Sequence, residues 1–200
     1  AQRSGPRPLA RRCSALPRFE VRPWQDSGGP FVVGQIACQQ FPLQIWSNLV
    51  ARHCRTMNAT SFHYPDQIGS KKLRETVVAY LRIARSLRCE AEQVMIVSGS
   101  QQAVEMCALV LLDAGSRVWV EEPGYRLARD VFTLVGARSV PVPVDMEGMD
   151  VAAGIRQARR ARAVLVTPSH QFPLGVTMSA TRRLQLLEWA QHSGAWIIED

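Results

Sequence analysis

From Arg117 to the end of the chain, short apolar segments alternate with longer amphipathic ones, and this alternation limits the possible folds more than any other feature. The short segments are Arg117–Val120, Ala163–Val166 and Trp196–Ile198, and the run Val94–Val97 precedes them. Short apolar runs that alternate with helical segments of about 10 to 15 residues are typical of buried strands in a parallel sheet. The sequence therefore predicts an α/β domain of three layers (α-β-α), with helices on both faces of a mostly parallel sheet.

The helical segments are predicted from apolar residues that recur at intervals of three and four. They are expected at 41–57, 69–87, 101–112, 125–135, 151–158 and 180–192. Gly136 is expected to end one of them, and Ser179 to cap the start of the last. The extended segment Val140–Val144 contains two prolines, which favour an irregular strand or one at the edge of the sheet.

The first 30 residues are rich in proline, glycine, arginine and serine and show no sustained period. We predict a linker or tail over 1–30 and a folded domain over 31–200. The formal charge of +7 suggests a nucleic-acid partner. Much of the excess, however, lies in the tail and on one short stretch at 156–162, which indicates a solvated basic surface in the folded part.

The five cysteines are odd in number and scattered, which argues against a disulfide scaffold and against a metal site. They favour a reducing, cytoplasmic compartment. No apolar run is long enough for a membrane-spanning helix.

Polar residues gather where the predicted strands end. The segment Ser98–Gln102 leads from a predicted strand into a helix, so its glycine, its hydroxyl groups and the helix N-terminus could cradle a phosphate. It matches neither the Walker loop nor the GxGxxG motif, and a tight turn between strand and helix would also explain it.

Two further residues follow strand ends. Tyr125 could stack on a flat heteroaromatic ligand, and Asp200 could keep a pyridine nitrogen protonated. Taken singly, the tyrosine could be a core or surface residue and the aspartate a helix cap. Because ligands of open α/β sheets bind beyond the carboxyl ends of the strands, these residues and the Ser100 turn together predict one pocket for a flat, phosphorylated, nitrogen-containing ring.

Several segments in this order resemble the fold-type-I enzymes that use pyridoxal 5'-phosphate (PLP), the aspartate-aminotransferase-like family, over roughly 31–200. They are SGSQQA at 98–103, VWVEEPGY at 118–125, TPSHQFPLGVTMS at 167–179, LEWA at 187–190 and WIIED at 196–200. The third segment is long and unusual. The match most resembles the aminotransferase-like domain of bacterial regulators of the MocR/GabR type, within the GntR family.

The resemblance implies PLP as the cofactor and assigns roles to four residues of the large domain. Ser100 and Gln101 would bind the phosphate of PLP, Tyr125 would stack on its ring, and Asp200 would pair with the ring nitrogen. No metal is implied.

The resemblance also assigns residues outside these strand ends. Tyr64 would reach the phosphate of the cofactor in the partner subunit of a homodimer, and Gly34 would lie near the substrate carboxylate. Many family members have an asparagine that donates to the phenolic oxygen of PLP where this chain has Phe172. That contact is therefore expected to be absent, or to come from His170 or Gln171.

The family's Schiff-base lysine and the arginine that clamps the substrate carboxylate would follow Asp200. The two lysines of the chain, Lys71 and Lys72, do not match that role. We therefore expect no catalytic residue in this chain and a large-domain fold that is incomplete at its C-terminus.

The resemblance implies a truncated PLP-binding domain of a transcriptional regulator. Such a regulator would bind DNA through a separate N-terminal domain and respond to an amino acid or amine. The alternatives are a fragment of a PLP-dependent amino acid aminotransferase and a remnant that binds nothing.

Overall fold

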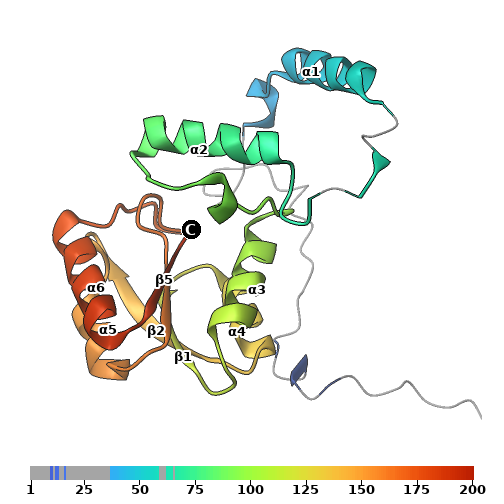
Figure 1. The fold of residues 1–200 in the computed structure, drawn as a ribbon. Helices are drawn as coiled ribbons and strands as arrows, with labels where there is room; N and C mark the ends of the chain where they lie inside the picture. Colours follow the sequence, from blue (N-terminus) through green and yellow to red (C-terminus); the bar gives the residue numbers. More distant parts are fainter. Residues whose placement is uncertain (1–9, 11, 14–15, 17–36, 59–61, 65) are drawn as a thin grey trace, which may run out of the picture. The chain divides into compact units, whose positions relative to one another are not determined.

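The computed structural model describes residues 10, 12–13, 16, 37–58, 62–64 and 66–200. The chain forms two compact units, one of residues 99–200 with 1–22 and one of residues 23–98 (Figure 1).

The 23–98 unit contains the two helices that the sequence predicts there. Helix α1 spans Leu43–Thr56 and helix α2 spans Lys71–Arg85, with 3-10 turns η2 at Cys38–Gln40 and η4 at Ala91–Gln93. Arg74 of α2 is buried and joins the segments on either side of the helix. Its guanidinium donates to the carbonyl oxygens of Gly69, at 3.1 Å, and Ala91, at 2.6 Å, and pairs with Asp66 at 2.7 Å.

The prediction of a strand at Val94–Val97 is wrong. This segment is irregular, and one backbone hydrogen bond of 2.9 Å joins the Ile96 N–H to the Ile68 carbonyl. Its side chains are half-buried or exposed. An apolar run becomes a strand only when a neighbouring strand supplies a hydrogen-bonded ladder, and this run pairs with a turn instead.

The 99–200 unit is the predicted three-layer α/β domain. Its sheet has the order β3-β2-β1-β4-β5, and every pairing is parallel except that of β2 with β3. The strands are β1 (Arg117–Glu122), β2 (Arg138–Asp145), β3 (Gly148–Met149), β4 (Ala163–Val166) and β5 (Trp196–Glu199).

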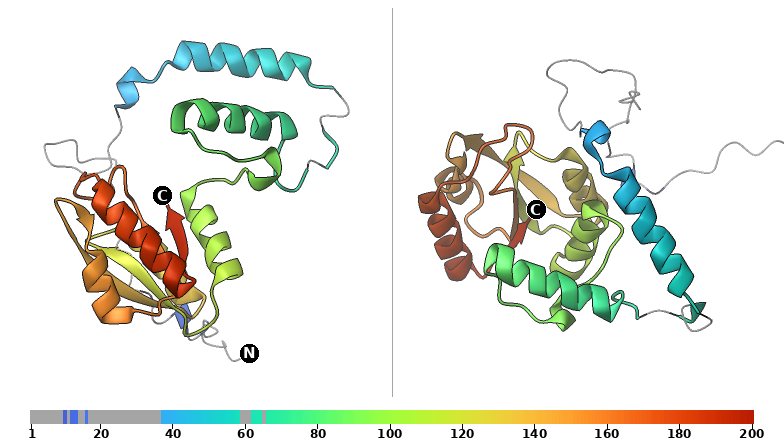
Figure 2. Two further views of the ribbon diagram at one scale, coloured as in Figure 1. Left: turned by 60° about the vertical axis from the view of Figure 1, so that its left-hand side comes forward. Right: turned by 90° about the horizontal axis from the view of Figure 1, so that it is seen from above.

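Four helices cover the two faces of this sheet (Figures 1 and 2). Helices α3 (Ser100–Leu111) and α4 (Arg126–Leu134) pack on one face, and α5 (Val151–Ala158) and α6 (Ala180–Ser193) on the other. Strand residues alternate between the two cores: Val118 packs under α3 and α4, whereas Trp119 packs under α5 and α6. The predicted bounds of these helices hold to within one residue.

Two tryptophans fix the α5–α6 side of the sheet. The indoles of Trp119 and Trp189 stack with their ring centroids 3.7 Å apart. They donate to consecutive carbonyl oxygens at the end of α5, those of Ala158 (3.0 Å) and Arg159 (3.1 Å). Gly154 lets α5 approach this pair, because a Cβ there would lie 2.8 Å from the Trp119 ring.

The predicted features of strand and helix ends are largely confirmed. Strand β2 lies between β3 and β1, but β3 pairs only with Val144 and Asp145. Pro141 and Pro143 therefore lie where β3 does not pair with β2, as predicted for an edge strand. Gly136 follows α4 with φ +79°, and the Ser179 hydroxyl accepts from the Arg182 N–H at 3.3 Å at the start of α6.

Candidate cofactor site

Three of the predicted cofactor residues lie at the carboxyl edge of the parallel strands in the 99–200 unit. Ser100 begins α3, Tyr125 lies between β1 and α4, and Asp200 follows β5. The Asp200 N–H donates to the Val166 carbonyl at 3.1 Å, which holds the end of β5 against β4. The chain end and the start of α3 lie on the same side of the sheet (Figures 1 and 2).

Gln101 and Tyr125 are in direct contact. The Tyr125 hydroxyl donates to Gln101 Oε1 at 3.2 Å, and Gln101 Nε2 donates to the Leu127 carbonyl at 3.2 Å. The Gln101 side chain is thus held by the start of α4. The bond to Leu127 uses one of the two amide hydrogens of Gln101, so its backbone N–H and its second amide hydrogen are the donors it can offer to an anion at the start of α3.

The start of α3 has the donors that an anion needs. No side chain caps this helix, and its first turn is closed by a 3.1 Å bond from the Ala103 N–H to the Gly99 carbonyl. Ser100 is exposed, and a Cβ added to Gly99 would meet no atom within 4 Å. A hydroxyl, helix N–H groups and open space suit a phosphate group.

The remaining parts also fit PLP by their chemistry. The half-buried ring of Tyr125 offers an aromatic face, and the exposed carboxylate of Asp200 has no hydrogen-bond donor among the described residues. A carboxylate of this kind can pair with a protonated pyridine nitrogen.

A buried polar network behind these residues was not predicted from the sequence. The Glu121 side chain is 6% exposed at the end of β1 and accepts from the backbone N–H of Thr167 at 3.2 Å, from the Thr167 hydroxyl, and from Gln171 Nε2 at 3.1 Å. It therefore ties the end of β1 to the segment that follows β4. The one signal in the sequence is a glutamate that directly follows the apolar run of β1.

The Gln171 amide is fully engaged in this network. Besides Glu121, Nε2 donates to the carbonyls of Pro123 (2.8 Å) and Phe172 (2.7 Å), while Oε1 accepts from the Leu174 N–H at 3.1 Å. The suggestion that Gln171 supplies the donor to the phenolic oxygen of PLP is therefore wrong. His170, which is exposed, stays as the candidate for that contact.

The turn after β1 depends on Gly124. A Cβ at this position would lie 2.4 Å from the Glu121 carbonyl oxygen, so no larger residue fits. The same carbonyl accepts from Arg129, whose guanidinium also pairs with Glu122. The peptide bonds before Pro123 and Pro173 are cis.

The other predicted residues lie elsewhere or are not described. Tyr64 belongs to the 23–98 unit and its side chain is fully exposed. Gly34 lies outside the described residues. Lys71 and Lys72 begin α2, where Lys71 approaches Glu75 at 3.9 Å.

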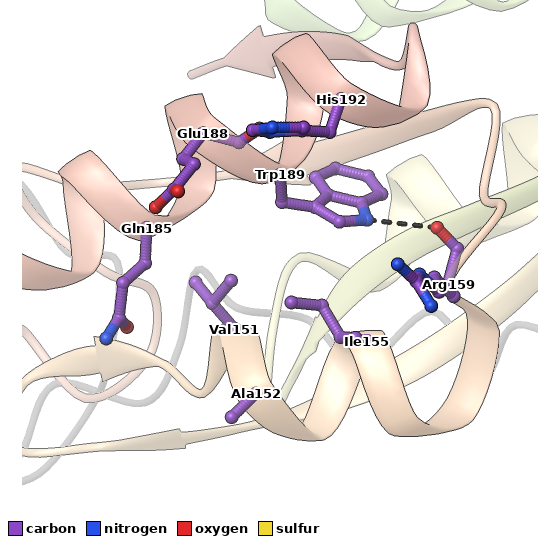
Figure 3. A pocket seen from close by; sticks show the side chains of 8 residues that line it. All are labelled: Val151, Ala152, Ile155, Arg159, Gln185, Glu188, Trp189 and His192. Atoms are coloured by element: carbon purple, nitrogen blue, oxygen red, sulfur yellow. Dashed lines mark hydrogen bonds between the residues drawn. The ribbon is translucent and has the colours of Figure 1, made fainter.

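A groove of about 350 Å³ lies between α5 and α6 and contains none of the predicted cofactor residues (Figure 3). Within the described part of the chain, no cluster of histidine, cysteine, aspartate or glutamate has the arrangement of a metal site. No helix there has the length and apolar character that crossing a bilayer requires.

Comparison with known proteins gives a consistent result. Residues 39–200 match the family model "Aminotransferase class I and II". The chain is 35% identical over 189 residues, 94% of its length, to the probable rhizopine catabolism regulatory protein MocR of Rhizobium meliloti. It is 36% identical over 138 residues, 69% of its length, to the pyridoxine biosynthesis transcriptional regulator PdxR of Corynebacterium glutamicum, which is of the helix-turn-helix (HTH) type.

Solved structures show the same fold. A kynurenine aminotransferase from Pyrococcus horikoshii superimposes with a TM-score of 0.82 over 96% of this chain, at 27% identity. LysN, an α-aminoadipate aminotransferase of Thermus thermophilus, gives 0.75 over 85% at 31% identity. The chain spans 37% of the MocR protein, 29% of PdxR, 50% of the kynurenine aminotransferase and 43% of LysN.

Proposed function

Because this chain belongs to the class I and II aminotransferase family, we propose that it is the front part of a PLP-binding, aminotransferase-like domain of a MocR-type transcriptional regulator. The observation that carries the proposal is the position of Ser100, Gln101, Tyr125 and Asp200 at one edge of one sheet, with Gln101 bonded to Tyr125. The regulator is favoured over other family members because MocR and PdxR, two relatives of at least 35% identity, are named as regulators.

Each residue at this edge has a defined task in the proposed site. The Ser100 hydroxyl and the N–H groups at the start of α3 would hold the phosphate. Tyr125 would lie against the ring, and its hydroxyl bond to Gln101 would set the angle of its own ring. Asp200 would keep the ring nitrogen protonated, and in that state bound PLP acts as an electron sink.

The Glu121–Gln171 network supports this site from behind. It fixes the segment that carries His170 and Phe172 to the end of β1, so these two exposed residues can face the ligand in a constant geometry. The two lysines of this chain begin α2, in the 23–98 unit, and have no task in the proposed site.

Equilibrium dialysis of the chain against PLP tests the proposal. We expect saturable binding of one PLP per chain, and binding of pyridoxal, which lacks the phosphate, at least tenfold weaker. Absence of saturable PLP binding, or equal affinity for the two ligands, would overturn the proposed site.

Further parts of the proposal concern the whole protein. We propose that it is cytoplasmic, that it is a homodimer in which Tyr64 reaches the partner's cofactor, that it responds to an amino acid or amine, and that it reads DNA through a separate domain. Light scattering that shows a strict monomer would contradict the dimer.

An amino acid aminotransferase is the second candidate, since kynurenine and α-aminoadipate aminotransferases share this fold at 27% and 31% identity. The coding sequence upstream of Ala1 separates the two. A helix-turn-helix module there supports the regulator, and its absence supports the enzyme.

A further inference from the structure

Three arginines form one row across the amino edge of the sheet, opposite the edge that carries the proposed PLP site. Arg117 and Arg138 are the first residues of β1 and β2 and are partners in the parallel register. Arg162 directly precedes β4, and its N–H donates to the Arg117 carbonyl at 2.7 Å. Strands β2, β1 and β4 are neighbours, so the three arginines stand side by side at intervals of about 4.8 Å.

The side chains of Arg117 and Arg138 start from the same face of the sheet, whereas the guanidinium of Arg162 reaches the Leu111 carbonyl at the end of α3, which packs on the other face. The residues two places along β1 and β2, Trp119 and Val140, both pack in the α5–α6 core, and side chains two apart share a face. The three arginines are exposed. Like charges opposite each other on neighbouring strands repel, and an anion bound across the row would relieve that repulsion.

No acid compensates for the row within the described part of the chain. The ion pairs found there involve other cations. Within that part, one guanidinium of the row has a hydrogen bond, from Arg162 Nε to the Leu111 carbonyl at 3.2 Å. The loops at this edge, at 112–116, 135–137, 159–162 and 194–195, are all described and contain a single acid, Asp113.

More positive charge lies beside the row, where α5 ends. Arg159 and Arg160 follow this helix and, with His192, line a second groove of about 460 Å³ that adjoins the one in Figure 3. Cations at a helix C-terminus are favoured by the helix dipole, which gives Arg159 and Arg160 a role within the fold. The arginines that begin β1 and β2 have no such role.

We propose that this amino edge binds the phosphate backbone of double-stranded DNA without reading its bases. The guanidinium group matches phosphate geometry with paired N–H donors. The row spans about 10 Å, the axial length of about three phosphates on one DNA strand. Among the residues that the structure describes, no exposed aromatic side chain at this edge shares the face of Arg117 and Arg138. Trp196 lies on the same side of its strand as Ile198, which packs in the α3–α4 core on the opposite face of the sheet.

This inference rests on the proposed function, because a regulator is held close to DNA. The edge lies at the far end of the strands from the PLP site, so DNA and PLP could be bound together. The contact would strengthen binding to DNA and orient the protein on the duplex, while another domain would recognise the base sequence.

The test is fluorescence anisotropy of the chain with a labelled duplex of arbitrary sequence, over a range of salt concentrations. The variant R117Q/R138Q/R162Q should bind at least tenfold more weakly, and its slope of log K against log salt should be shallower by about 2 to 3, as expected for three lost phosphate contacts. The control R52Q/R55Q/R82Q removes the same charge from exposed positions of α1 and α2 and should change both quantities much less.

Equal losses in the two variants, or none in either, would overturn the proposal. So would a preference of the row for single-stranded RNA or for vesicles of anionic lipid over the duplex. PLP binding is measured on the same proteins: the row variant should keep it, so a failure of the DNA contact is separable from a failure of the PLP site.

Discussion

The side-chain amide of Gln171 donates to the carboxylate of Glu121 at 3.1 Å, across 50 residues of sequence, and both side chains are buried. This bond joins the end of β1 to the turn that carries His170 and Phe172. A neutral amide is required because the groups around Nε2 are all acceptors: the Glu121 carboxylate and the carbonyls of Pro123 and Phe172.

The first prediction concerns this amide. Gln171→Glu would place a second carboxylate among buried acceptors, and we expect a loss of about 2 to 4 kcal/mol in the free energy of unfolding. The loss should be smaller in acid, where the new carboxyl is protonated. Urea unfolding at two pH values measures it. Gln185→Glu, on the exposed side of α6, is the matched control and should change stability by less than about 0.5 kcal/mol.

The second prediction concerns Gly154. Glycine to alanine within a helix normally stabilises by about 0.5 to 1 kcal/mol. Here the added methyl meets the buried Trp119 ring at 2.8 Å, so Gly154→Ala should destabilise by about 1 to 3 kcal/mol. Thermal unfolding gives the sign of the effect. Ala152→Gly, on the exposed side of the same helix, measures the effect of helix propensity without a packing contact. If Gly154→Ala stabilises the protein, the contact between α5 and Trp119 is looser than the structure indicates.

The third prediction concerns Ser100. Removing its hydroxyl by Ser100→Ala takes one donor from the proposed phosphate site, and PLP affinity should fall about tenfold, the usual effect of losing a hydrogen bond to a charged group. Equilibrium dialysis is the measurement. Ser193→Ala, at the end of α6, should bind PLP like the unaltered chain. Unchanged affinity of the Ser100 variant would place the phosphate elsewhere.

The fourth prediction concerns pH. The 2.8 Å bond from the Glu147 N–H, aided by Arg182, holds the pKa of Asp145 below its ordinary value of 3.8. A lowered pKa in the folded state means that the ionised carboxylate stabilises the protein above that ordinary value, and the contribution disappears as the pH falls through the folded-state pKa. Because Asp145 is exposed, the gain should be well under 1 kcal/mol.

Acid unfolding of Asp145→Asn, compared with the unaltered chain, measures this contribution. The difference in stability should be present at neutral pH and vanish in strong acid.

Much of the α/β domain could be predicted from the sequence because its elements are specified locally. Helix α5 and strand β4 begin and end where the pattern of apolar residues indicates. The Ser179 cap depends on a side chain and a backbone group three residues apart. The prediction of a strand at Val94–Val97 was wrong because strand formation needs a neighbouring strand, which the local sequence does not specify.

The candidate site divides in the same way. That Tyr125 and Asp200 follow strand ends can be predicted, because parallel strands of one sheet all end at the same edge. Ser100 lies at the start of α3 without a strand before it, so its place at this edge comes from the packing of α3 (Figure 1). The sequence alone did not reveal that Gln101 is held by Tyr125, or that Gln171 is bonded to Glu121.

The residue pattern therefore predicts the order of the elements, the class of fold and the edge at which the polar residues gather, since each follows from contacts within a few residues. The tertiary structure alone decided which distant residues meet. The Trp119–Trp189 stack, the Glu121–Gln171 bond and the alignment of Arg117 with Arg138 and Arg162 all depend on strand order and register. Register is fixed when the whole sheet packs between its helices, because only then are all the apolar faces buried at once.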